Sequence, residues 1–86
     1  MIGWREFQSM DLDERVKVLY EQGSFVTSIR YYAHKVNLYL LNNYYVEVFY
    51  NPKIDRIEKV TLLDSNHSRM NFYYDQIKLP NQILSH

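Results

Sequence analysis

Hydrophobic residues near the start of the chain recur with the spacing of one helical face. The stripe consists of Leu12, Val16, Leu19 and Tyr20. Asp11 precedes this stripe and Glu14 follows three residues later, which is the spacing of a capping box. Gly23 can end the helix in a left-handed conformation. We therefore predict a helix over residues 11–22.

Two weaker helical patterns lie nearer the ends of the chain. Trp4 and Phe7 are three residues apart, which predicts a single helical turn that folds both large rings onto the core. A second helix is predicted over residues 66–78, because Pro80 follows an apolar stripe there. The stripe consists of Met70, Tyr73 or Tyr74, and Ile77. We expect residues 81–86 to form a frayed tail.

Between these helices the apolar residues alternate along the chain, and β-branched and aromatic residues dominate. This pattern extends from Ser24 to Leu63 and predicts four antiparallel strands that follow one another as a meander. We place the first strand at about 24–32 and the second at about 35–41, with residues 33–34 as a two-residue turn. The third and fourth strands lie on either side of the turn-forming residues 51–55.

The length of the loop between the second and third strands decides which side chains share a face. A loop of two asparagines, 42–43, would pair Leu41 with Tyr44 and would separate the valines of the third strand from the apolar residues of the second. A loop of three residues, 41–43, pairs Leu40 with Tyr44 and keeps these apolar residues together. Because one face of the sheet must pack on helices, we predict the three-residue loop.

The predicted register gives the sheet two different faces. The apolar face collects Phe25, Ile29, Tyr31, Val36, Leu38, Leu40, Tyr44, Val46, Val48, Val60 and Leu62. The opposite, open face carries polar and aromatic residues that can face water. We therefore expect an α+β fold of two layers in a single domain, residues 1–86, with an N-terminal helix, a four-stranded antiparallel meander and a C-terminal helix. Both helices are expected on one face of the sheet.

The composition excludes several classes of protein. The 86 residues include 10 basic side chains, 10 acidic side chains and no cysteine. Zero net charge argues against a nucleic-acid partner, because nucleic-acid binders usually carry a basic stripe. The lack of cysteine excludes a disulfide framework and a thiolate nucleophile. We find neither a signal peptide nor the roughly 20 apolar residues of a membrane span, so we expect a cytoplasmic protein without membrane contact.

Candidate binding residues form a polar row across the open face. In the predicted register each member of the row lies opposite the next, in the order Arg30, Asn37, Glu47 and Lys59. Together with neighbouring aromatic residues, the candidate binding residues are Arg30, Asn37, Tyr39, Tyr45, Glu47, Phe49 and Lys59. This face is either an ordinary solvated surface or a recognition surface, since tyrosine and arginine are enriched where interfaces hold their binding energy.

The ionisable residues form no catalytic or metal-binding pattern. The three histidines, at positions 34, 67 and 86, do not have the spacing of metal ligands. No serine sits in a nucleophile motif, and the two glycines cannot form a phosphate-binding loop. We therefore expect no catalytic residue, no metal site and no cofactor, and we expect that the protein is not an enzyme.

Four segments of the chain resemble a set of small uncharacterised bacterial proteins. These segments are Trp4–Phe7, Leu19–Val26, Lys35–Tyr39 and Tyr45–Asn51. The resemblance covers most of the chain and implies a small cytoplasmic α+β protein without an assigned activity, so it brings no functional residue with it. A helix followed by a meander is also similar to the cystatin-type layout, which is a likeness of shape alone.

These observations favour a small intracellular protein-interaction or regulatory module. Its partner would be another protein, and self-association into a homo-oligomer is one form of this hypothesis. The binding surface would be the open face or the edge of the first strand near Val26, Ser28 and Arg30, because a meander leaves two unpaired edges. The alternative hypothesis is nucleic-acid binding, with bases stacked on the aromatic residues of the open face.

Overall fold

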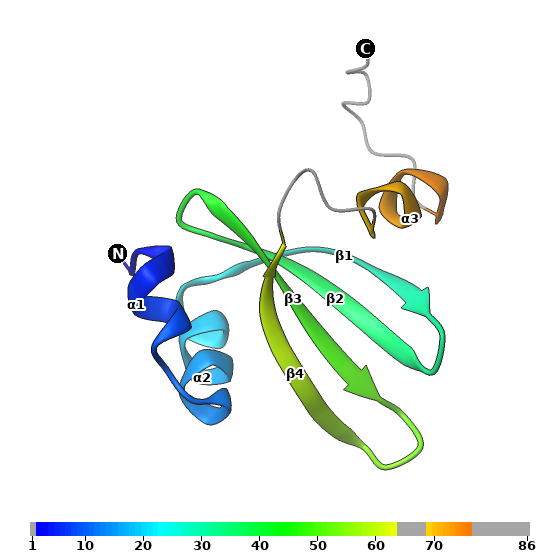
Figure 1. Cartoon of the computed structure of the whole chain (residues 1–86), viewed down its shortest axis with the longest axis horizontal. Coiled ribbons are helices and arrows are strands. Elements are labelled where there is room, and N and C mark those ends of the chain that lie inside the picture. Colours follow the sequence, from blue (N-terminus) through cyan, green and yellow to red (C-terminus); the bar gives the residue numbers. More distant parts are fainter. Residues whose placement is uncertain (1, 64–68, 77–86) are drawn as a thin grey trace.

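The structure is a computed structural model that describes residues 2–63 and 69–76 (Figure 1). Its elements are α1 (Trp4–Gln8), α2 (Leu12–Gln22), β1 (Ser24–Tyr31), β2 (His34–Leu41), β3 (Tyr44–Asn51), β4 (Arg56–Leu63) and α3 (Arg69–Gln76). The strands form one antiparallel sheet in the order β1-β2-β3-β4, which confirms the α+β class and the meander. The rest of the helix predicted over 66–78, and the tail predicted over 81–86, lie outside the described residues.

Helix α2 begins as its sequence predicts. The Asp11 carboxylate accepts a hydrogen bond from the Glu14 backbone N–H at 2.9 Å, and the Glu14 carboxylate accepts one from the Asp11 N–H at 3.0 Å. Gly23 follows the helix, but its φ of −84° is not left-handed. A Cβ added at Gly23 would lie 2.8 Å from the carbonyl oxygen of Leu19. It is therefore close backbone approach, rather than backbone conformation, that requires glycine here.

Helix α1 brings one large ring into the core instead of two. Phe7 has 1% of its surface exposed, whereas Trp4 has 45% exposed. The guanidinium of Arg5 lies 5.1 Å from the centroid of the Trp4 ring, on the outside of the molecule. The expectation that Trp4 folds onto the core is therefore wrong, and Phe7 alone anchors α1.

The loop between β2 and β3 has two residues, not the predicted three. Leu41 lies opposite Tyr44, and Asn42 adopts a left-handed φ of 57°. Compared with the predicted register, β3 is shifted by one residue. Each β3 side chain therefore shares a face with the β2 side chains that were predicted to lie on the other face. The prediction failed because it assumed that only one face of the sheet would be apolar.

Helices cover both faces of the sheet, and the predicted placement of both helices on one face is wrong. We call the face under α1 and α2 the α2 face; its core cluster is Phe7, Val18, Leu19, Leu41, Val46, Val48 and Val60. The opposite face, the α3 face, packs on Tyr73 of α3; its cluster is Ile29, Val36, Leu38, Phe49, Leu63 and Tyr73. Val48 and Phe49 are successive residues of β3, so the two clusters lie on opposite sides. Figure 1 shows α3 well separated from α1 and α2.

The loop between β1 and β2 also differs by one residue from the prediction. Tyr31 pairs with His34, so the turn consists of Tyr32 and Ala33 instead of residues 33–34. Tyr32 has a φ of 56°, which a large side chain rarely adopts, and 83% of its surface is exposed. The pairing of the flanking strands, and not the preference of the turn residues, therefore fixes this loop.

The capping box of α2 gives a first test of the fold. Asp11→Ala should lower the free energy of unfolding by about 1 kcal/mol, because both capping hydrogen bonds are lost. Asp13→Ala is the matched control, since Asp13 lies in the same first turn but is not the capping residue, and it should cost less. Urea unfolding followed by circular dichroism measures both values. Equal costs for the two variants would contradict this role of Asp11.

Candidate functional site

The predicted polar row does not exist, because the observed register separates its members. Arg30 lies opposite Lys35, and Asn37 lies opposite Ser28 and Val48. The candidate residues divide between the two faces: Arg30, Asn37 and Tyr39 lie on the α2 face, and Tyr45, Glu47, Phe49 and Lys59 lie on the α3 face. The aromatic platform that nucleic-acid binding would use is divided in the same way.

Glu47 is the central residue of the α3 face, and it is fully buried, with 0% of its surface exposed. The guanidinium of Arg69 donates to its carboxylate from Nε, at 3.0 and 2.9 Å, and from Nη2, at 2.8 Å. The Tyr73 hydroxyl donates a further hydrogen bond at 3.0 Å. Both donors come from α3, so the carboxylate holds this helix on the sheet.

The electrostatics of this cluster keep Arg69 charged and Tyr73 protonated, so both can donate hydrogen bonds to Glu47. Hydrogen bonds to Glu47 raise the pKa of Arg69. Burial, and then the charge of Glu47, raise the pKa of Tyr73, so its hydroxyl keeps its proton and remains a donor. The Arg69 guanidinium also lies over two rings, 5.5 Å from the centroid of Tyr31 and 5.4 Å from that of Phe49. The polar groups of this cluster are satisfied by the chain itself.

Sequence reasoning missed Arg69 and Tyr73 as the partners of Glu47. The two residues are four apart, so they share one face of α3. An acidic residue between Val46 and Val48 is the signal that a buried carboxylate needs a cation. The incorrect register placed Glu47 on an open face, where no partner from a helix was required.

A second cluster lies on the α3 face where the β1–β2 loop meets β4. It contains Tyr31, Tyr32, His34, Phe49, Glu58 and Lys59. His34 Nε2 lies 2.7 Å from Glu58 Oε1, and this hydrogen bond lowers the pKa of Glu58. Lys59 Nζ lies 5.0 Å from the centroid of Phe49. Lys59 therefore already lies over the Phe49 ring, and Glu58 already pairs with His34.

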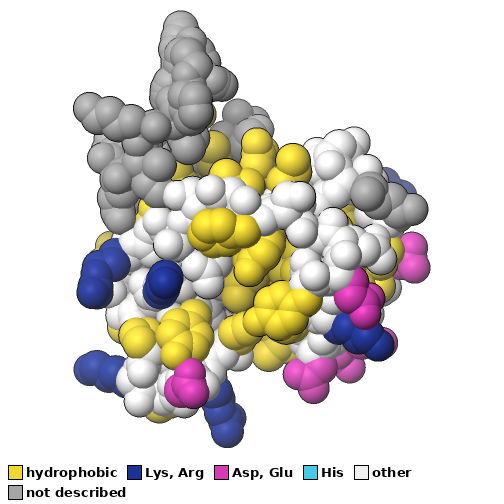
Figure 2. Space-filling view, turned by 180° about the vertical axis from the view of Figure 1, so that it is seen from behind, with side chains coloured by type: hydrophobic (Ala, Val, Ile, Leu, Met, Phe, Trp, Pro, Cys, Tyr) yellow, Lys and Arg dark blue, Asp and Glu magenta, His cyan; other side chains and the backbone are white. Residues whose placement is uncertain are grey.

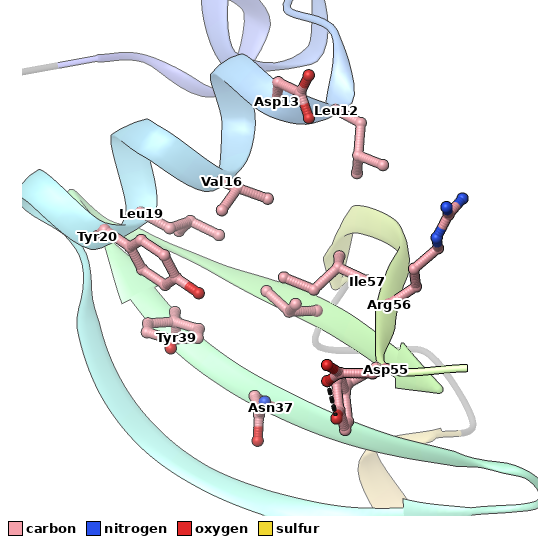
Figure 3. Close-up of a pocket in the computed structure, with 12 residues that line it drawn as sticks. Leu12, Asp13, Val16, Leu19, Tyr20, Asn37, Tyr39, Asp55, Arg56 and Ile57 are labelled. Atoms are coloured by element: carbon pink, nitrogen blue, oxygen red, sulfur yellow. Dashed lines mark hydrogen bonds between the residues drawn. The ribbon is translucent and has the colours of Figure 1, made fainter. Parts of the chain in front are cut away.

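The α2 face, in contrast, carries a groove of about 640 Å³ between α2 and the sheet. Its apolar lining is Leu12, Val16, Leu19, Tyr20, Tyr39, Val48 and Ile57. Its polar lining is Asp13, Asn37, Tyr50, Asp55 and Arg56. Figure 3 shows Val16, Tyr20 and Ile57 pointing into the space between the helix and the strands. In the space-filling view, hydrophobic side chains gather in the middle of the molecule, with charged side chains on either side (Figure 2).

The groove exists because α2 is too narrow to cover the strands. A helix is about 10 Å wide with its side chains, whereas a strand of 8 residues is roughly 26 Å long. Val18 and Leu19 of α2 are buried with Leu41, near the β2–β3 loop. The other end of the same face carries Arg30 and Lys35, both exposed. One end of the α2 face is therefore covered and the other is bare.

Most of the exposed apolar surface around the groove was not predicted. Tyr20 was expected to point towards the core, but 71% of its surface is exposed. Phe25 is 59% exposed and packs edge-on against Tyr39, with ring centroids 5.7 Å apart. Burial, and then Tyr20, raise the pKa of Tyr39, and the hydrogen bond to Asp55 raises the pKa of Tyr50. The hydroxyls of Tyr39 and Tyr50 therefore keep their protons.

The two edges of the sheet differ in how they are protected. Along β4, Arg15 Nη1 donates to the Val60 carbonyl at 2.6 Å, while its Nη2 donates to the Gln8 carbonyl at 2.7 Å. Along β1, the pairing with β2 is irregular between Phe25 and Thr27. Bulges of this kind are one way in which proteins discourage the addition of a foreign strand. Neither edge is a regular, fully free strand.

The described residues, 2–63 and 69–76, contain neither a metal-binding group nor a membrane-spanning helix. No group of three or more histidine, aspartate or glutamate side chains in this part of the chain is arranged to hold a metal ion. No helix in it has the length and apolar character needed to cross a membrane.

The pair of Glu47 and Arg69 predicts strong coupling in a double-mutant cycle. Arg69→Met should cost about 3–5 kcal/mol of unfolding free energy, because it leaves a buried carboxylate without its cation. Glu47→Leu leaves the cation without its anion and should also destabilise the fold. The double variant should cost far less than the sum, since both charges leave together. Urea unfolding of the four proteins measures the cycle, and additive costs would show that the pair is not coupled.

The contact of His34 with Glu58 predicts a shift that nuclear magnetic resonance can measure. In His34→Ala, the pKa of Glu58 should rise towards its ordinary value, because the hydrogen bond that lowers it is lost. A lowered pKa in the folded state stabilises the protein above the unfolded pKa, and this stabilisation is lost as pH falls through the folded pKa. The variant should therefore lose less stability on acidification. Asn51→Ala is the control, with a smaller rise, since Asn51 makes the weaker, 3.5 Å hydrogen bond.

Comparisons of the chain with protein-family models, with curated proteins and with solved structures found no match.

Proposed function

We propose that the protein is a protein-interaction module and that its binding surface is the groove beside α2. The observation that carries this proposal is the gathering of exposed apolar side chains around one hollow. Tyr20, Phe25 and Leu12 are 71%, 59% and 37% exposed. Contiguous apolar surface of this kind commonly marks an interaction site on a soluble protein, and aromatic residues are enriched in such sites.

The lining of the groove favours a protein partner over a small molecule. A small-molecule site needs a few polar groups that converge on the ligand. Here Tyr50 already donates a hydrogen bond to Asp55 at 2.5 Å, so two polar groups of the groove satisfy each other. What the groove offers is an apolar trough beside a helix, which fits an apolar stripe of another chain.

The rest of the surface supports the same choice. On the α3 face, Arg69 and Lys59 lie over the aromatic rings that a partner would contact. At the edge of β1, the irregular pairing beside Phe25 disfavours addition of a strand. The groove is thus the surface that combines exposed apolar area with room for a partner.

Photo-cross-linking in the native cells tests this surface. A photoreactive phenylalanine analogue in place of Tyr20 should form adducts with a protein chain. The same analogue in place of Tyr32, which is even more exposed at 83%, is the matched control and should not. Val16→Glu, which puts a charge into the groove, should abolish the adducts of the Tyr20 position. Equal adducts at both positions, or none at Tyr20, would contradict the proposal.

A further inference from the structure

We propose that the partner of the groove is a second copy of this chain, and that the two copies pair through their α2 helices about a two-fold axis. This inference rests on the proposed function, because it names the occupant of the same groove. In the dimer, each α2 lies beside its counterpart and covers the bare end of the other copy's α2 face. Each sheet then has a second α2 helix across that face, in addition to its own α1 and α2.

The bare part of the face has the size of one helix. A helix is about 10 Å wide, and the strands are roughly 26 Å long, so the α2 face has room for two helices side by side. The chain supplies one of them, because α2 packs near the β2–β3 loop. The remaining space is bordered by α2 on one side, and Val48, Tyr50 and Ile57 lie on its floor. A second helix parallel to α2 fits this space.

The side of α2 that lines the groove is complementary to itself. Leu12, Val16 and Tyr20 are spaced by four residues, so they form one stripe, and all three line the groove. A two-fold axis that runs between the two helices, along their length, brings two parallel α2 helices together along this stripe and places the two sheets on opposite sides of the helix pair. Leu12, Val16 and Tyr20 of each copy then meet their own counterparts in the other copy. Such reciprocal contacts are what a two-fold interface requires.

The charges of the helix and of the bare sheet surface are also complementary. Among the described exposed residues of α2 are the acids Asp13, Glu14 and Glu21, against one exposed cation, Lys17. The bare end of the sheet carries Arg30 directly opposite Lys35, a pair of like charges. The acidic surface of α2 is attracted to the positive charge of Lys35 at this end of the sheet. Zero net charge on each copy means that the copies do not repel each other at long range.

Sedimentation velocity of the full chain over a range of concentrations tests the proposal. We expect a concentration-dependent dimer. Tyr20→Ser and Lys35→Glu should each raise its dissociation constant at least about tenfold, since each removes one side of the contact. The matched controls are Tyr32→Ser, at a more exposed tyrosine, and Lys53→Glu, at an exposed lysine of the β3–β4 loop. Neither control should change the dissociation constant.

Single cysteines place the axis directly, because the chain has no cysteine of its own. Val16→Cys should form a disulfide-linked dimer on mild oxidation, since the two copies of this position lie beside the axis. Tyr32→Cys, the control, should stay monomeric under the same conditions. Circular dichroism confirms that each variant is folded before it is assayed.

The outcomes separate this inference from the proposed function. The chain could be monomeric at all concentrations while its Tyr20 position cross-links to a different protein in cells. This result would contradict the dimer but support the groove as the binding surface. A dimer that Tyr20→Ser and Lys35→Glu leave unchanged overturns the α2 interface. A monomer without adducts at Tyr20 overturns both.

Discussion

A fully buried carboxylate in the middle of the sheet constrains the arrangement of the whole fold. Glu47 lies on β3, and none of its surface reaches water. Such a charge is costly unless a cation and further donors are buried with it. Arg69 and Tyr73 meet this requirement, and both belong to α3. A pair of this kind adds little net stability compared with apolar residues of the same size. Its effect is to fix where α3 docks, because any other position leaves the carboxylate without its partners.

The local structure could be predicted from the sequence, but the register could not. The capping box of Asp11 and Glu14 and the alternating pattern of the strands are signals between near neighbours, and the structure confirms them. The β2–β3 register depends on whether one or both faces of the sheet are covered, which is a property of the whole fold. Asn42 and Asn43 were the local signal for a tight two-residue loop. The assumption of a single apolar face outweighed that signal and moved Glu47 to the wrong environment.

The candidate groove could not be predicted from the sequence, and the reason differs from that for the register. The stripe of α2 predicts a buried side, and Leu19 is indeed only 1% exposed, but Tyr20 on the same stripe is 71% exposed. The difference arises because α2 lies across one end of the strands. Its side chains that point towards the bare end are therefore not fully covered by the sheet. Hydrophobic periodicity shows which side of a helix is apolar. It does not show how far along a strand the helix lies.

The two faces of the sheet are covered by different kinds of contact. On the α3 face, the short helix brings the Tyr73 ring and the Arg69 guanidinium, which lies over Tyr31 and Phe49. On the α2 face, coverage comes from apolar contact and from the hydrogen bond of Arg15 to the Val60 carbonyl, and it extends only as far as the helix is wide. The bare end of the α2 face therefore follows from the width of one helix compared with the length of the strands.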